Sequence, residues 1–240
     1  MRLVPERGSP LTMMRSRGSM GGSAGLGGRA ARSALRVAAD ELMAWGFEFR
    51  AEGVEKNKAS SIESAFLKGS TMINLLQIGA PQEIASRLPK GQLIQIKLEI
   101  DIDPPSGATT ETLTRLVPTP HQVRLYDPSS LFAGKLHAVL CRNWKSRVKG
   151  RDFYDFLWYV GRSIPLNLAH LQGRMRQSGD WPLETPLDAE GLRRRLEDRF
   201  ATVNFDQAKE DIAPFLKDPR ELTLWGSEFF MELISQLRTS

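Results

Sequence analysis

The chain has 240 residues, 41% of them hydrophobic, which is enough for one large domain or two small ones. A net charge of +5 is compatible with nucleotide or RNA partners without requiring them, and the single cysteine, Cys141, excludes an intramolecular disulfide framework. The sequence contains no apolar run of membrane-spanning length and does not open with a hydrophobic segment and cleavage signature, so we expect a cytoplasmic protein.

The first 29 residues are rich in Arg and Gly and almost free of acidic side chains. Such a segment buries too little apolar surface to offset the entropy of ordering, so we expect residues 1–29 to be a disordered tail. The next part, to residue 126, alternates helical and strand-like patterns. We predict helices at 30–45 and 81–88, a strand at 47–52, a hairpin formed by 62–68 and 72–78, and strands at 94–102, 112–117 and 122–126.

The clearest strand, 94–102, alternates isoleucine or leucine with polar residues, which indicates a sheet with one buried and one polar face. Glu99, Asp101 and Asp103 follow one another on the polar side and repel one another unless a cation lies opposite. A divalent metal held by Glu99 and Asp101 is one explanation, and Mg²⁺ suits such hard oxygen ligands. Simple solvent exposure, with Lys97 on the same face, is the other.

A helix is predicted to begin at Asp127-Pro128, because Asp can cap a helix and Pro suits its first turn. Phe132, Leu136 and Val139 recur at helical spacing as its buried stripe, and Lys135 lies beside that stripe. The stem of this lysine is expected to be covered while its ammonium reaches for a partner.

A cationic loop follows, and a second helix begins near Asp152, with Asp155 on the same face one turn later. The loop cations are Lys145, Arg147, Lys149 and Arg151. A lysine, a cationic loop and two carboxylates that converge at a helix start suit a phosphate-bearing substrate. The alternative is structural: the helix macrodipole favours acids in a first turn in any protein, and charged loops are commonly just solvated.

His137 and Cys141 are one turn apart, but two ligands do not make a zinc site, so we interpret Cys141 as a small buried filler. Beyond Tyr159 the pattern is helical. We predict helices at 167–177, 187–200, 206–215 and 224–237. The arginines of the second of these, Arg193, Arg194, Arg195 and Arg199, are interpreted as a solvated face with partners such as Glu190 for Arg194, rather than as an RNA-binding surface.

The segment SLFAGKLHAVLCRNWKSRVKGRDFYDFLWYV resembles the C-terminal signature of the AbiEii/AbiGii nucleotidyltransferase toxins of abortive-infection and toxin–antitoxin systems. Lys135 matches the family lysine, and the family's R-D-x-Y-D pattern is matched by Arg151, Asp152, Tyr154 and Asp155. The resemblance, which covers most of the chain from about Trp45, implies catalytic roles for Lys135, Asp152 and Asp155, with the loop cations on the nucleotide.

The same resemblance implies transfer of a nucleotide from an NTP to an RNA or protein acceptor, with Mg²⁺ and a third carboxylate from a strand such as that of Glu99 and Asp101. A cognate antitoxin is an implied partner. We therefore expect an α+β chain, with a partial nucleotidyltransferase-like mixed sheet and flanking helices over residues 30–126 and a helical domain over 127–240.

The family also opens with a strand–turn–helix carrying G-G-T/S, followed by a D-x-D strand, both before the region matched here. Gly21-Gly22-Ser23 copies the first motif only superficially, because no strand-like run precedes it and no D-x-D strand follows in the expected place. The alternative hypothesis is therefore a truncated or degenerate homologue without catalysis, which binds a nucleotide or an antitoxin.

Overall fold

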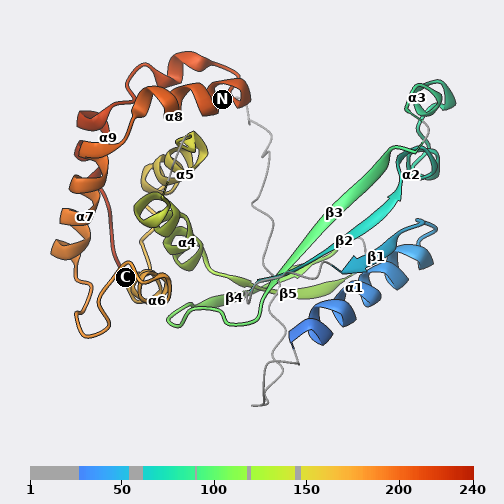
Figure 1. Ribbon diagram of the computed structural model, residues 1–240, viewed down its shortest axis with the longest axis horizontal. Coiled ribbons are helices and arrows are strands. Elements are labelled where there is room, and N and C mark those ends of the chain that lie inside the picture. Colours follow the sequence, from blue (N-terminus) through green and yellow to red (C-terminus); the bar gives the residue numbers. More distant parts are fainter. Residues whose placement is uncertain (1–26, 54–61, 90, 118–119, 144–146) are drawn as a thin grey trace. The chain divides into compact units, whose positions relative to one another are not determined.

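A computed structural model describes residues 27–53, 62–89, 91–117, 120–143 and 147–240, which form two compact units divided between Pro104 and Pro105. The Arg/Gly-rich tail, apart from its last three residues, and Gly21-Gly22-Ser23 lie outside these ranges. The described chain is α+β, as predicted, with helices in both units and two small antiparallel sheets (Figure 1).

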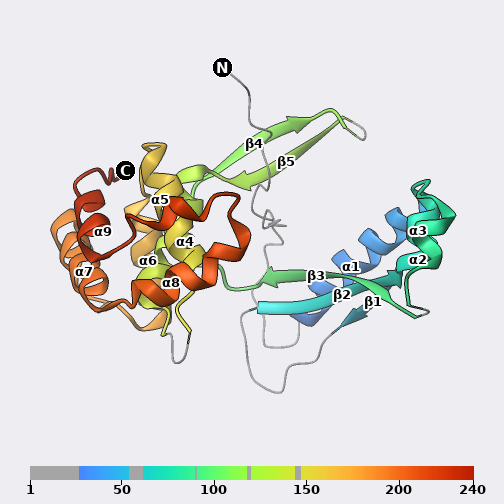
Figure 2. The ribbon, with the colours of Figure 1, turned by 90° about the horizontal axis from the view of Figure 1, so that it is seen from above.

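The first unit is a three-stranded antiparallel sheet with a helix across it (Figure 2). The strands, in spatial order, are β1 (Arg50–Gly53), β2 (Ile62–Ser70) and β3 (Leu93–Asp101), and α1 (Gly27–Ala44) packs on β2. Ala39, Phe49 and Leu67 form its small core, and Ile94 and Leu98 of β3 pack against them. The strand predicted over 94–102 is thus confirmed, although Ile96 on the same face is 41% exposed.

The hairpin predicted from 62–68 and 72–78 is wrong in its second half. Thr71–Gln77 is helix α2, and β2 pairs with β1 and β3 instead. Ser70 explains the change, because its hydroxyl accepts the Ile73 N–H and its carbonyl accepts the side-chain amide of the buried Asn74. These local bonds begin a helix where the apolar run alone suggested a strand. Helix α3 (Gln82–Ser86) follows.

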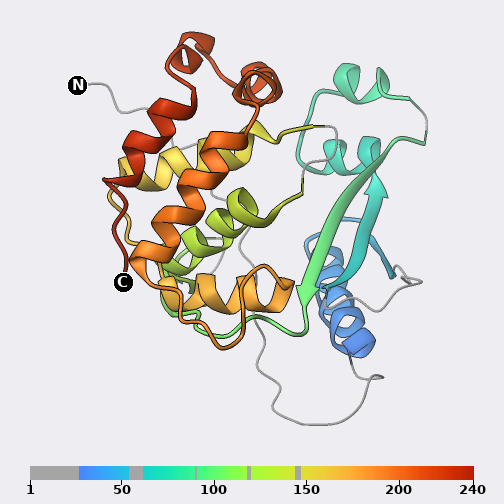
Figure 3. The same cartoon turned by 60° about the vertical axis from the view of Figure 1, so that its left-hand side comes forward.

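The second unit opens with an antiparallel hairpin, β4 (Thr110–Arg115) and β5 (His121–Tyr126), which projects from a group of helices (Figure 2). The helices are α4 (Pro128–Cys141), α5 (Gly150–Gly161), α6 (Leu168–Ser178), α7 (Ala189–Thr202), α8 (Phe205–Ile212) and α9 (Ser227–Ile234), with 3₁₀ turns at Ala213–Phe215 and Pro219–Leu222. Helix α4 is central and contacts α5, α6 and α7 (Figure 3).

Helix α4 begins as the sequence predicts. Asp127 is its N-cap and accepts the Ser130 N–H at 2.7 Å, and Pro128 occupies the first turn. Phe132, Leu136 and Val139 are fully buried in the main core. Aromatic rings fill much of the rest of this core. Phe153, Phe156, Phe200, Phe205 and Phe230 contact one another across α5, α7, α8 and α9.

The start of α5 is fixed by two features of α8. A Cβ on Gly150 would lie 2.0 Å from the carbonyl oxygen of Ala208, so the two backbones approach more closely than any side chain permits. The N-cap position, Lys149, makes no capping bond, and the carboxylate of Asp211 accepts the Gly150 N–H at 3.0 Å in its place. Glycine before the R-D-x-Y-D segment is therefore required by packing.

We predict that Gly150→Ala lowers the free energy of unfolding by at least about 2 kcal/mol, because the added methyl group has no space and α8 must move. Gly161→Ala at the other end of the same helix is the matched control, since a Cβ there meets nothing within 4 Å. Urea denaturation of both variants checks this. Equal free energies of unfolding for the two variants would contradict the prediction, because they would show that α8 moves to accommodate the methyl group at little cost.

Candidate active site

The predicted catalytic residues lie on the packed helix pair α4 and α5. Lys135 donates from α4 to Asp155 of α5, with Nζ 2.7 Å from Oδ2. Both side chains are about one-third exposed, at 36% and 34%, so a solute can reach the pair. The sequence prediction that the stem of Lys135 is covered while its ammonium seeks a partner agrees with this geometry.

Asp152 lies one turn before Asp155 and forms a second ion pair with Arg142, the C-cap residue of α4. Its side chain is only 12% exposed, whereas that of Arg142 is 39% exposed. Burial raises the pKa of Asp152 and outweighs the opposite effects of Arg142 and Lys149; the Asp155 carboxylate raises it further. Keeping Asp152 charged in the folded protein thus costs free energy, because its carboxylate is removed from water. The partly exposed Arg142 does not offset this cost.

Tyr159 extends this side of α5 toward the core. Its ring stacks on Phe132 with centroids 4.7 Å apart, and burial together with the Asp155 carboxylate raises its pKa to about 12. The phenol therefore stays neutral at physiological pH and is no base for proton transfer.

The loop cations do not gather at one point. Arg147 pairs with Asp211, a carboxylate whose side chain is only 2% exposed, and Arg151 lies over the Phe215 ring, 5.1 Å from its centroid. Lys149 is exposed and acts on the charge of Asp152. Lys145 lies outside the described residues. The structure thus brings Lys135, Asp152 and Asp155 together on one helix pair and gives Arg147 and Arg151 separate contacts on the other side of the loop.

The predicted metal ligands belong to the first unit. Glu99 lies opposite Ser64 on β2, accepts a bond from its hydroxyl at 3.3 Å, and pairs with Lys97 at 2.6 Å. Asp101 ends β3 and accepts the Asp103 N–H at 3.1 Å, so the third carboxylate of the row lies beyond the strand. Lys97 thus supplies a cation beside Glu99, and the oxygen atoms of Glu99 and Asp101 are of the kind that suits a hard cation.

A family model described as "Nucleotidyl transferase AbiEii toxin, Type IV TA system" matches residues 29–232. The chain belongs to the AbiEii family. No curated protein and no solved structure matches it.

Membership confirms the resemblance carried by Lys135 and the R-D-x-Y-D segment, and supports a nucleotidyltransferase-like toxin of a toxin–antitoxin system. The matched range includes both units, so this AbiEii chain carries the strand of Glu99 and the α4–α5 pair within one family domain. In the described ranges, no helix combines the length and apolar character that crossing a membrane requires.

The contacts of three residues around the α4–α5 pair of the AbiEii chain were not predicted from the sequence. Arg142 and Asp211 form the ion pairs described above, and Arg199 of α7 donates to the carbonyls of Val139 and Arg142 at 2.8 and 2.6 Å. Arg199 thereby satisfies the C-terminal carbonyls of α4, and burial lowers the pKa of its guanidinium. The solvated-face interpretation is correct for Arg194, which pairs with Glu190 at 3.0 Å, and wrong for Arg199.

The raised pKa of Asp152 predicts a pH-dependent stability. A carboxyl group whose folded-state pKa is raised stabilises the fold while protonated and loses that contribution as pH rises from its ordinary value, about 3.9, through the raised one. Asp152→Asn removes the titration. The free energy of unfolding of this variant, relative to that of the wild type, should therefore increase as pH rises through that window. Urea denaturation of both proteins at a series of pH values measures the difference.

Asp198→Asn, on the exposed side of α7, is the control for the exchange of a carboxylate for an amide. A difference between Asp152→Asn and the wild type that shrinks toward neutral pH would mean that Arg142 stabilises the carboxylate more than burial disfavours it.

Proposed function

We propose that this protein transfers a nucleotide from an NTP to an RNA or protein acceptor, with pyrophosphate as the leaving group. The observation that carries the proposal is the solvent-accessible pair of Lys135 and Asp155, with Asp152 one turn away, in a chain of the AbiEii family. A cation and two carboxylates are thus presented side by side by two packed helices, so that little reorganisation is needed to hold a charged substrate.

Nucleotidyl transfer depends mostly on positioning and on neutralising phosphate charge. In our scheme Lys135 exchanges its partner Asp155 for phosphate oxygens of the NTP. The released Asp155, or Asp152, then orients the acceptor hydroxyl and takes its proton. The hydroxyl oxygen forms a bond to the α-phosphorus, and the bond from that phosphorus to the pyrophosphate oxygen breaks.

The loop cations are proposed to contact the remaining phosphates. Lys149 already acts on the Asp152 side of the loop, and Arg151 would have to leave the Phe215 ring, as Arg147 would have to leave Asp211. Lys145 completes the set in sequence. An arginine that presents several N–H donors in a plane suits a phosphate better than it suits an aromatic ring, which favours the exchange at Arg151.

Mg²⁺ is the cofactor that this scheme expects, because it neutralises phosphate charge when bound. Glu99 and Asp101, on one face of β3, offer the hard oxygen atoms that Mg²⁺ prefers, and they are the residues that we propose to hold it. Membership of a Type IV toxin–antitoxin family also supports a cognate antitoxin as a protein partner.

Binding without transfer is the second candidate. Each of the three central charges already has a partner, since Lys135 pairs with Asp155 and Asp152 with Arg142. The strand–turn–helix motif that grips a triphosphate in the family is also not matched by the residues around Gly21-Gly22-Ser23. In this case the protein retains a nucleotide, or competes for an antitoxin, and no bond is made.

We predict that purified protein with Mg²⁺ and labelled NTP labels an RNA or protein acceptor, and that Lys135→Ala reduces the rate at least about a hundredfold, because a charge that neutralises the transferred phosphate is lost. The same substitution should change the free energy of unfolding by less than about 1 kcal/mol, because the ion pair is about one-third exposed.

Arg194→Ala is the control, since it removes an exposed cation from α7 that also pairs with a carboxylate. Nucleotide binding that depends on Lys135, with no labelled acceptor under any condition, would exclude transfer and favour the binding function. Binding that is indifferent to Lys135→Ala would exclude the site itself.

A further inference from the structure

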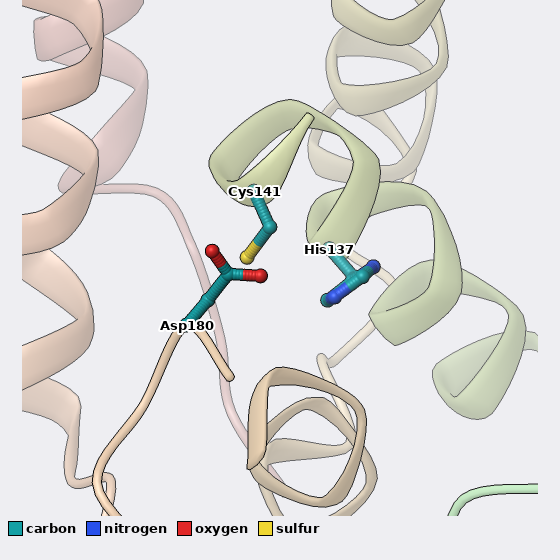
Figure 4. A group of neighbouring side chains, drawn as sticks. All are labelled: His137, Cys141 and Asp180. Carbon is teal, nitrogen blue, oxygen red and sulfur yellow. The ribbon is translucent and has the colours of Figure 1, made fainter. Parts of the chain in front are cut away.

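A group of metal-ligating side chains lies on α4, apart from the Lys135–Asp155 pair. His137 and Cys141 are one turn apart on this helix, and Asp180 lies in the turn after α6 (Figure 4). A ring nitrogen of His137, the sulfur of Cys141 and a carboxylate oxygen of Asp180 all lie within 4.8 Å of one another. All three residues are half-buried. Within the ranges that the structure describes, this is the one group of three such residues.

The third ligand is placed by a rigid turn. Helix α6 ends at Gly179, whose φ of 79° is the left-handed conformation that closes a helix, and the Asp180 N–H donates to the Met175 carbonyl at 2.8 Å. Because α6 packs on α4, this turn delivers the Asp180 carboxylate to the sulfur of Cys141 (Figure 4). The sequence showed only two ligands, and the tertiary fold supplies the third from 39 residues beyond Cys141.

We propose that His137, Cys141 and Asp180 bind Zn²⁺, with a water molecule in the fourth position. Imidazole, thiolate and carboxylate together are the ligand set of zinc rather than of Mg²⁺, and three protein ligands leave one position open. Ligand atoms around tetrahedral zinc lie about 3.3–3.6 Å apart, so no separation in the group must shorten by more than about 1.5 Å, which rotation of half-buried side chains provides.

The surrounding contacts keep the ligands close without a metal. The single hydroxyl proton of Ser178 is shared between the Asp180 carboxylate and the Met175 carbonyl, and the hydroxyl oxygen contacts His137 Nε2 at 2.9 Å. Ser178 thus links the first and third ligands. With zinc bound, this hydroxyl is placed to orient one of them, as outer hydrogen-bond partners do in zinc sites.

Charge balance determines the cost of binding. The Cys141 thiolate and the Asp180 carboxylate together offset both charges of Zn²⁺. Arg142 and Arg174 act on His137, where they oppose a cation. Arg195 and Arg199 act on Cys141, where they favour the thiolate. Burial, and next the Asp180 carboxylate, raise the pKa of the Cys141 thiol to about 12, so zinc must displace the thiol proton, which leaves to solvent as the sulfur–zinc bond forms.

Co²⁺ titration of the chelator-treated, full-length protein tests the site, because a cobalt–thiolate bond gives a charge-transfer band in the near ultraviolet. Cys141 is the only cysteine of the chain, so this band can come from no other residue. We expect one equivalent of Co²⁺ to produce the band, Zn²⁺ to displace it, and Cys141→Ser to abolish it. His137→Gln and Asp180→Asn should each weaken binding at least about tenfold.

The matched control is His121→Gln, which removes an exposed histidine from β5 and should leave the titration unchanged. Circular dichroism establishes that each variant is folded. Absence of the band in folded wild-type protein overturns the proposal. A band that His137→Gln and Asp180→Asn leave unaltered also overturns it, because it would show adventitious binding to the thiol alone.

Discussion

Two packed helices, α4 and α5, face each other with opposite charges: Lys135 with Asp155 and Arg142 with Asp152. The two cations are seven residues apart and lie on one face of α4, and the two acids are three residues apart and lie on one face of α5. The apolar side chains beneath, among them Phe132 and Phe156, set the separation of the helices and hence the meeting of the charges. Packing thus determines the geometry of the candidate site, and the partly exposed Lys135–Asp155 pair adds little to its stability.

The loop between these helices is constrained at its end by α8. Gly150 packs so closely against the Ala208 carbonyl that a Cβ would not fit, and its N–H donates to the Asp211 carboxylate. Asp211 also forms an ion pair with Arg147. A carboxylate from elsewhere in the chain therefore caps α5, while Asp152 in its first turn is left to pair with Arg142. The two carboxylates therefore differ in role. Asp211 holds the start of α5 in place, whereas burial raises the pKa of Asp152 by more than its cationic neighbours lower it.

Local rules predicted much of this arrangement from sequence. The Asp127-Pro128 start of α4, the buried stripe and the alternation in β3 are set by neighbours along the chain, as was the family signature itself. Contacts between distant residues were not predictable: Arg199 at the end of α4 and Asp211 at the start of α5 come from 57 to 61 residues away. The misassigned strand at 72–78 failed for a subtler reason, because Ser70 and Asn74 decided the local hydrogen bonds against the apolar pattern.

Helix α4 joins the two proposed sites because of its periodicity. Positions 135 and 142 face α5 and carry the cations, whereas 137 and 141 face the end of α6 and carry imidazole and thiol. One helix therefore presents two chemistries to two neighbours, and its C-terminal carbonyls are satisfied by a third, through Arg199 of α7. A metal bound at the α6 side would restrain the same turns that position Lys135 and Arg142, since a ligand that binds only the folded state stabilises every contact on which its site depends.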